Sequence, residues 1–138
     1  MLFYMTVAGL QQAISQFWGY TTFRPLQSEA MDAVLAGRDS IVVLPTGGGK
    51  SLCFQAPAML HSGVAVVVSP LISLMKDQVD TLVGNGVPAA LFNSTLSSAE
   101  KSEVVAGLRH GRYKLLYVSP ERLVGDGSDS FLTILSSI

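Results

Sequence analysis

The sequence predicts an α/β domain in which helices cover both faces of a parallel sheet. From residue 40 onwards, short aliphatic or β-branched runs alternate with segments of helical periodicity, which is typical of βαβ units. The runs are continuously apolar rather than alternating, as expected of strands buried on both faces. Strands are expected at 40–44, 64–68, 89–92 and 114–118.

Helices are expected between these strands and towards both ends of the chain. An amphipathic pattern over 8–18 stops at Gly19, and a second, over 26–35, has Pro25 in its first turn. Ser97, followed three residues later by Glu100, predicts a capping box at the start of a helix. The later helices are expected at 50–60, 71–83, 97–108, 120–124 and 131–138.

Length and charge restrict the classes of protein that fit. The chain has 138 residues and a formal net charge of -1, which suits one domain and excludes a strongly basic nucleic-acid-coating protein. Charged residues make up 14%, against about 25% in a typical domain. The single cysteine, Cys53, excludes an internal disulfide and a cysteine-rich metal site.

A long uncharged stretch raises the question of a membrane span. Residues 51–75 contain no Asp, Glu, Lys or Arg, and roughly 20 residues suffice to cross a bilayer. Pro57, Pro70 and a Ser-Gly break at 62–63 would leave backbone groups unpaired in lipid. The sequence therefore predicts no membrane association and a cytoplasmic protein.

A glycine-rich segment, PTGGGKS at 45–51, directly follows the first predicted strand and precedes a helical pattern. Backbone N–H groups of small residues can point at phosphate oxygens, and a helix N-terminus adds partial positive charge. In the predicted phosphate loop, Lys50 reaches the β- and γ-phosphates as the catalytic residue, and Ser51 binds Mg²⁺. The predicted nucleotide-binding residues of the loop are Thr46, Gly47, Gly48, Gly49, Lys50 and Ser51.

The loop departs from the strict G-x-x-x-x-G-K-[ST] template at one position, where this chain has Leu44 instead of glycine. That departure weakens a match to small GTPases and kinases of the strict type. A glycine-rich hairpin followed by a chance Lys-Ser is the alternative interpretation. The strand–loop–helix context favours the phosphate loop.

A second cluster of candidate residues lies upstream, at 17–27. Tyr20 and Arg24 offer two flat groups that can enclose a purine ring, and Gln27 offers a donor and an acceptor suited to the adenine amino edge. The alternative is that the aromatic side chains belong to the core and that Gln27 is solvated at a helix start. The residues alone leave both interpretations open.

Four segments together resemble, in order, the first four motifs of the RecQ family of ATP-dependent DNA helicases. They are FWGYTTFRPLQ (17–27), LPTGGGKSLCFQ (44–55), VSPLISLMKDQV (68–79) and YVSPERL (117–123). The resemblance covers nearly the whole chain, and Trp18 departs mildly from the Phe common in the family.

The resemblance implies a P-loop NTPase domain of the RecA-like helicase type. Residues 1–138 would form the N-terminal part of the first motor domain, which would be incomplete at its C-terminal end. The cofactors would be ATP and Mg²⁺, with adenine held by Tyr20, Arg24 and Gln27. The activity would be 3′–5′ unwinding, and the partner single-stranded or duplex-junction DNA.

Two further loops acquire a role from the same resemblance. The loop after the 64–68 strand would contact phosphates of single-stranded DNA, and the loop after the 114–118 strand would make a second contact to the DNA backbone. The predicted DNA-binding residues are Ser69, Pro70, Leu71, Lys76, Ser119 and Arg122. The alternative is that Ser-Pro only starts a helix in each case and that the two cations are solvated.

Part of the machinery for ATP hydrolysis has no counterpart in the sequence. Proteins similar to RecQ carry an Asp-Glu-Ala-His segment, and no Asp-Glu pair occurs in these 138 residues. Glu121 is the only carboxylate near an equivalent place, and Pro120 and Arg122 beside it argue against that role. We expect a fragment without the second motor domain and inactive alone, or else a module that binds nucleotide or single-stranded DNA without turnover.

Overall fold

A computed structural model of the chain describes residues 2–124 and 129–138. These residues form two compact units, 1–62 and 63–138, and each is described by itself. The predicted loop at 125–128 lies outside the described residues. Among the helices that the structure describes, none is long and apolar enough to cross a membrane.

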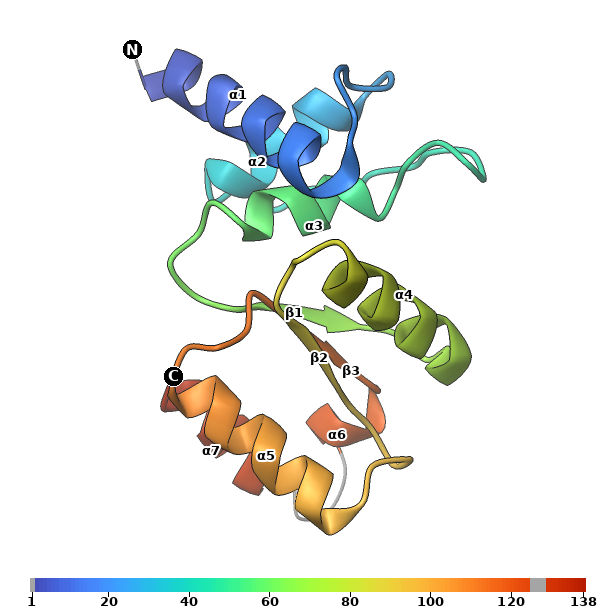
Figure 1. Cartoon of the computed structure of the whole chain (residues 1–138), viewed down its shortest axis with the longest axis vertical. Helices are drawn as coiled ribbons and strands as arrows, with labels where there is room; N and C mark the ends of the chain where they lie inside the picture. The colour runs from blue at the N-terminus through green and yellow to red at the C-terminus, as the bar shows by residue number, and fades with distance from the viewer. Residues whose placement is uncertain (1, 125–128) are drawn as a thin grey trace. The chain divides into compact units, whose positions relative to one another are not determined.

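Helices build the first unit (Figure 1). Helix α1 (Leu2–Ala13) continues into a π-helical turn, η1 (Ile14–Trp18), and α2 (Gln27–Leu35) and α3 (Leu52–Ala58) follow. The α1–η1 helix starts earlier than predicted but ends where expected, because Gly19 adopts φ 73° and closes the turn. Two buried clusters lie in this unit: one is Leu10, Ile14, Met31, Leu52 and Ala56, and the other is Ala30, Leu44 and Cys53.

Helix α3 is shorter than the 50–60 segment that the pattern predicts. Pro57 lies inside it and has no N–H to donate to the Cys53 carbonyl, so one regular hydrogen bond of this short helix is missing. The N–H groups of Met59 and Leu60 instead bond three residues back, to the carbonyl oxygens of Ala56 and Pro57. The helix therefore ends at Ala58.

The predicted strand at 40–44 is wrong. This segment is extended, yet it pairs with none of the described strands. Ile41 is 95% exposed and Val43 is 82% exposed. An apolar β-branched run favours a buried strand, but its burial requires neighbouring strands, and in the described structure this run has none.

A three-stranded parallel sheet with the order β1-β3-β2 lies at the centre of the second unit. Strands β1 (Ala65–Val68), β2 (Ala89–Phe92) and β3 (Leu115–Val118) coincide closely with three predicted strands. Helices α4 (Ile72–Gly84), α5 (Ser98–Arg109), α6 (Glu121–Val124) and α7 (Asp129–Ser136) complete the unit (Figure 1). The predicted parallel α/β architecture is confirmed.

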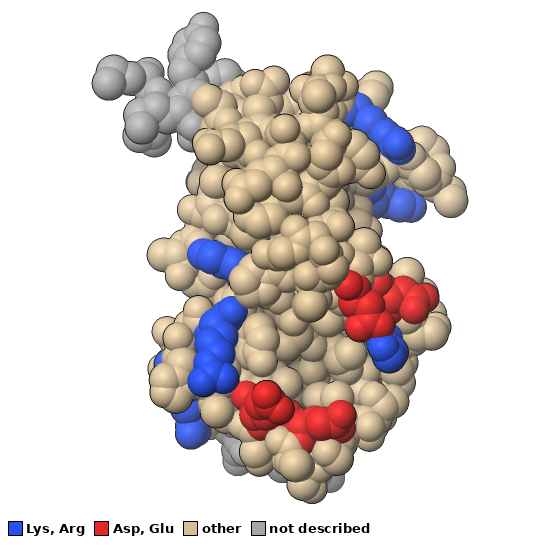
Figure 2. Space-filling view, in the orientation of Figure 1, with Lys and Arg blue, Asp and Glu red and all other residues tan. Residues whose placement is uncertain are grey.

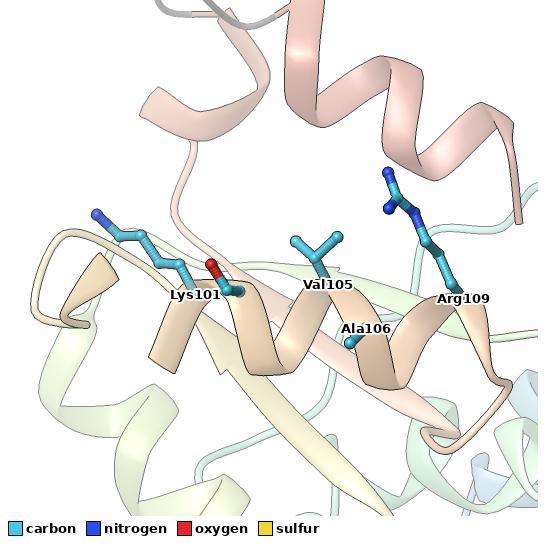
Figure 3. A pocket seen from close by; sticks show the side chains of 5 residues that line it. Lys101, Val105, Ala106 and Arg109 are labelled. Carbon is cyan, nitrogen blue, oxygen red and sulfur yellow. The ribbon is translucent and has the colours of Figure 1, made fainter. Parts of the chain in front are cut away.

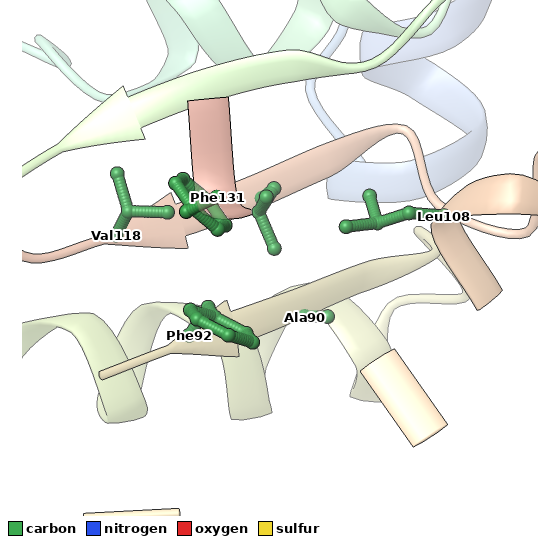
Figure 4. Close-up of a cluster of buried hydrophobic side chains, with 6 residues drawn as sticks. Ala90, Phe92, Leu108, Val118 and Phe131 are labelled. Atoms are coloured by element: carbon green, nitrogen blue, oxygen red, sulfur yellow. The ribbon is translucent and has the colours of Figure 1, made fainter. Parts of the chain in front are cut away.

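Helices cover both faces of this sheet. On one face, Phe92 of β2 stacks on Phe131 of α7 with ring centroids 4.9 Å apart (Figure 4). On the other, the Tyr117 hydroxyl of β3 donates a hydrogen bond to Oε1 of Gln78 in α4, at 2.7 Å. The cluster on the first face is Ala90, Phe92, Leu108, Leu116, Val118 and Phe131.

The predicted capping box is present at the start of α5. The backbone N–H of Glu100 donates to the Ser97 hydroxyl oxygen at 3.2 Å, and the Ser97 N–H donates to the Glu100 carboxylate at 2.7 Å. These bonds stabilise the ionised carboxylate and lower the pKa of Glu100, chiefly through the backbone N–H of Ser97. Two N–H groups that the helix leaves unpaired are thereby satisfied.

Replacing Ser97 with Ala removes this cap, and we expect the free energy of unfolding to fall by about 1 kcal/mol. Urea denaturation of the full chain measures the change. Ser102→Ala on the exposed surface of the same helix is the control, with an expected change within about 0.5 kcal/mol.

The cap also predicts a pH dependence with a definite sign. Because folding lowers the pKa of Glu100, its stabilisation is complete above the ordinary pKa of 4.5 and is lost as pH falls through the lower pKa of the folded state. The stability difference between wild type and Glu100→Gln, which keeps the side-chain length but cannot ionise, should therefore shrink in acid. A difference that stays constant down to pH 2 contradicts this account.

Candidate functional site

The glycine loop in the first unit has a backbone that only small residues allow. Gly47 and Gly49 adopt φ 79° and φ 82°, in the left-handed region. A Cβ atom on Gly48 would lie 2.9 Å from the carbonyl oxygen of Pro45, which already accepts the Gly48 N–H at 2.8 Å. The loop therefore folds as a tight turn whose geometry depends on all three glycines.

Lys50 and Ser51 stand where this loop enters α3. The N–H of Cys53 donates to the Lys50 carbonyl at 3.2 Å, and the N–H of Gln55 donates to the Ser51 carbonyl at 3.0 Å. The Lys50 side chain is exposed, and Ser51 is half-buried. Next to the positive end of a helix, this pair can meet phosphate oxygens.

Two residues of the predicted adenine segment bond directly to the loop. A guanidinium N–H of Arg24 donates to the carbonyl oxygen of Gly47, and Nε2 of Gln27 donates to that of Gly49 at 3.1 Å. Gln27 is only 2% exposed, and its Oε1 accepts the backbone N–H of Arg24 at 2.7 Å. Both ends of the Gln27 carboxamide are thus engaged within the protein, while the Tyr20 side chain is 49% exposed.

The thiol of Cys53 also contacts the loop. Its Sγ donates to the Gly49 carbonyl oxygen at 3.6 Å, and burial raises the pKa of the thiol. Cys53 is therefore a protonated core residue that helps to hold the loop, in agreement with its interpretation from sequence as a small hydrophobic residue.

Leu26 has a backbone conformation that the sequence does not reveal. It adopts φ 68° and is the one non-glycine residue with positive φ in the described chain. For a branched side chain this conformation costs about 1–2 kcal/mol. Leu26 lies between Arg24 and Gln27, so the strain falls within the turn that bonds to the glycine loop. Leucine is not a residue type typical of left-handed turns, so the sequence does not predict this backbone strain.

The donor set around the loop suits Mg²⁺ bound together with a nucleotide. The described residues contain no group of three or more His, Cys, Asp or Glu side chains that could enclose an ion. Mg²⁺ usually takes one or two protein oxygens together with phosphate oxygens and waters. The Ser51 hydroxyl at the loop–helix junction could supply one such oxygen.

A second candidate site lies in the other unit, at the carboxyl edge of the sheet. Val118 of β3 is paired with Val68 of β1 and with Phe92 of β2. The residues that follow, Ser69, Ser119 and Asn93, therefore form one polar row in neighbouring positions along this edge. Ligands bind at the carboxyl ends of strands in open α/β sheets.

Most of the polar row is covered, whereas its neighbours are exposed. Ser119 is 5% exposed, and Ser69 is half-buried, with its Oγ accepting the N–H of Leu71 at 3.3 Å. Pro70 and Leu71 are exposed. The first loop thus presents apolar side chains outwards, and in the second Glu121 is exposed while Arg122 is half-buried.

The two predicted DNA-binding cations already have partners. Nζ of Lys76 lies 2.5 Å from Oδ2 of Asp80, and this hydrogen bond is the main cause of the raised pKa of Lys76. The Arg122 guanidinium lies 5.3 Å from the centre of the Phe92 ring. Contact with a phosphate would add to or replace these interactions.

Asn93 is the member of the row that sequence reasoning missed. It is fully buried, and its Nδ2 has no hydrogen-bond partner among the described residues. An unpaired buried amide costs about 1–3 kcal/mol. The only feature of the sequence that points to Asn93 as a site residue is its place directly after a predicted strand. An Asn-Ser-Thr sequence at that place is equally typical of an ordinary turn.

The surface carries no broad basic area on the face seen in Figure 2. There the described residues are mostly uncharged, with small separate groups of basic and acidic side chains. A shallow hollow on α5 is lined by side chains from that helix alone (Figure 3): Lys101, Ser102, Val105, Ala106 and Arg109. None of these belongs to either predicted site, and their single-helix origin offers no convergent groups for a nucleotide.

Several known helicases are similar in sequence to this chain. Residues 24–133 match the model of the DEAD/DEAH box helicase family. An ATP-dependent DNA helicase RecQ of Synechocystis is 50% identical over 117 residues, covering 85% of this chain and 24% of the relative. The RecQ helicase of Bacillus subtilis is 47% identical over 129 residues, with coverages of 93% and 21%. The predicted resemblance to RecQ helicases is confirmed.

A solved structure supports the fold. The crystal structure of the DUF1998 helicase MrfA bound to DNA matches with a TM-score of 0.67 at 20% identity, covering 83% of this chain and 17% of that one. This likeness bears on the fold alone. The chain spans about a quarter or less of the length of the RecQ relatives named above.

The crowding at Gly48 gives a direct test of the phosphate loop. In Gly48→Ala the new Cβ meets the Pro45 carbonyl oxygen, so the loop must shift, and we expect nucleotide affinity to fall at least tenfold. Gly63→Ala is the matched control, because its Cβ meets nothing within 4 Å. Fluorescence titration with a labelled nucleotide measures both, and equal affinities for the two variants would contradict the assignment.

Proposed function

The chain belongs to the DEAD/DEAH box helicase family, and from this premise we propose that it is the nucleotide-binding part of a RecQ-type ATP-dependent DNA helicase. One observation carries the proposal: the loop of three glycines ends in Lys50 and Ser51 at the start of α3 and is held by Arg24 and Gln27. Family membership alone does not indicate which residues of this chain would bind the nucleotide, whereas this arrangement does.

In the proposed site the phosphates of ATP lie against the backbone N–H groups of residues 46–51. Lys50 places its ammonium on the β- and γ-phosphates, where it offsets their charge, and Ser51 supplies a hydroxyl oxygen to Mg²⁺. Mg²⁺ would bridge phosphate oxygens and withdraw charge from them. The backbone N–H groups of the loop orient the nucleotide, and the Gly48 N–H must exchange its present bond to the Pro45 carbonyl to take part.

Adenine is proposed to lie beside Tyr20 and Arg24, with its amino edge at Gln27. The Gln27 carboxamide must then exchange its bonds to Gly49 and Arg24 for bonds to the base. Such an exchange would couple base recognition to the shape of the phosphate loop, because the same side chain holds Gly49.

The proposed nucleic-acid partner is single-stranded DNA or a duplex junction, translocated 3′–5′. Ser69, Pro70, Leu71 and Lys76 would make one contact to the backbone, and Ser119 and Arg122 a second. A protein that slides along DNA needs a few phosphate contacts rather than a basic surface, which agrees with a net charge of -1. The proposed location is the cytoplasm, in association with the nucleoid in a bacterium.

We further propose that residues 1–138 form part of the first motor domain and bind ATP without turning it over. No Asp-Glu pair is present to hold the metal shell and orient water. The same observation favours the second candidate, a module that binds nucleotide or single-stranded DNA without hydrolysis. The two differ in whether further helicase domains act together with this chain.

Replacing Lys50 with Ala should weaken ATP binding in Mg²⁺ at least about tenfold, because a charge-assisted contact to phosphate is lost. Titration with a fluorescent ATP analogue measures this loss. Lys101→Ala on α5 removes a cation elsewhere and should leave affinity unchanged. DNA-stimulated ATP turnover that survives Glu121→Gln and disappears in Lys50→Ala would contradict the proposed inactivity.

Gln27→Ala separates base recognition from a purely structural role. If Gln27 contacts the adenine edge, the variant should lose more affinity for ATP than for GTP. Loss of its bond to Gly49 alone should weaken both nucleotides equally. Competition titrations with ATP and GTP distinguish base recognition from a structural role. Gln11→Ala on the exposed surface of α1 is the control.

A further inference from the structure

The carboxamide of Asn93 has one satisfied end and one unsatisfied end. Its Oδ1 accepts the backbone N–H of Thr95 at 2.9 Å and the Thr95 hydroxyl at 2.5 Å. A backbone nitrogen can only donate, so the oxygen is placed on this side and Nδ2 on the other. Nδ2 has no partner among the described residues, although Asn93 is fully buried.

An unpaired buried donor lowers stability, and a well-packed apolar side chain would avoid that loss. Such exceptions in folded proteins call for a specific explanation, and they concentrate at functional sites. Asn93 follows β2 directly and lies in the polar row with Ser119 and Ser69, where a ligand would approach.

The surroundings of Asn93 suit a phosphate-bearing ligand. The ring of the preceding residue, Phe92, lies under the guanidinium of Arg122. Ser94 and Thr95, in the turn after Asn93, are both exposed. Besides the Asn93–Thr95 bonds, the turn contains one long backbone bond, from the Leu96 N–H to the Asn93 carbonyl at 3.4 Å. These are the hydrogen bonds that a shift of the turn would break.

We propose that Asn93 is a third contact to the DNA backbone, with Nδ2 donating to a phosphate oxygen of a single strand that lies along the carboxyl edge of β1-β3-β2. Because Nδ2 is covered in the present conformation, binding includes a shift of the 93–96 turn. The inference rests on the proposed function and adds a residue from β2 to the contacts proposed after β1 and β3.

Asn93→Leu tests the contact with a side chain that has the same number of heavy atoms and the same branching but neither a donor nor an acceptor. The probe is a fluorescein-labelled oligo(dT) strand, and the readouts are its dissociation constant across salt concentrations, the affinity for ATP and the urea midpoint. We expect binding of the strand to weaken about tenfold, with unchanged ATP affinity. The urea midpoint shows whether the variant, which also loses the two bonds from Thr95 to Oδ1, is still folded under the conditions of the titration. Thr95→Val, which loses only the hydroxyl bond to Oδ1, should bind within about twofold of wild type.

Salt dependence separates this neutral contact from a cationic one. An amide donor releases no counterion, so Asn93→Leu should weaken binding by the same factor at every salt concentration. Arg122→Gln should instead reduce the slope of log affinity against log salt by about 0.7. Wild-type affinity in Asn93→Leu overturns the inference alone, whereas a wild-type chain that does not bind the strand overturns the proposed DNA contacts and this inference together.

Discussion

The pairing of β3 with a strand on each side is the constraint on which the second unit depends. All four β3 residues are buried, and its register aligns Val68, Val118 and Phe92. Parallel pairing then places the carboxyl ends of three strands at one edge, so that residues 69, 93 and 119 become neighbours although they are far apart in the chain. A one-residue slip of β3 would exchange the side chains that face α4 for those that face α5 and α7.

The two candidate sites share a physical feature: several of their polar side chains already have partners within the protein. Gln27 and Arg24 hold carbonyl oxygens of the glycine loop, Lys76 pairs with Asp80, and Arg122 lies over Phe92. Binding of a nucleotide or of DNA would exchange these interactions for new ones, so the gain is the difference between two sets of bonds. Such exchanges make affinity sensitive to residues that never contact the ligand.

Local patterns predicted the elements whose stability is local. The capping box at Ser97 and Glu100 depends on residues three apart, and the β2 run is bounded by turn residues, so both could be predicted from the sequence. The strand expected at 40–44 failed because pairing is a property of neighbours that hydrophobicity does not encode. The loop residues 47–51 were predictable as a motif.

Bonds between distant segments were beyond sequence reasoning. The attachment of Gln27 to Gly49 joins residues 22 positions apart, and no pattern in either segment specifies it. The unpaired Nδ2 of Asn93 is likewise a result of packing and hydrogen-bond geometry. Both can be seen in the folded structure and neither can be read from the sequence.

The extended segment at 40–44 also has a consequence for how the chain would be handled in a cell. With no ladder among the described strands, its backbone amides lack the protection that slows hydrogen–deuterium exchange. The same exposed β-branched side chains, Ile41 and Val43, form the kind of surface that chaperones bind and proteases cleave. Residues 40–44 run directly into the glycine loop, so hydrogen–deuterium exchange in this segment can be followed beside the loop in the same measurement.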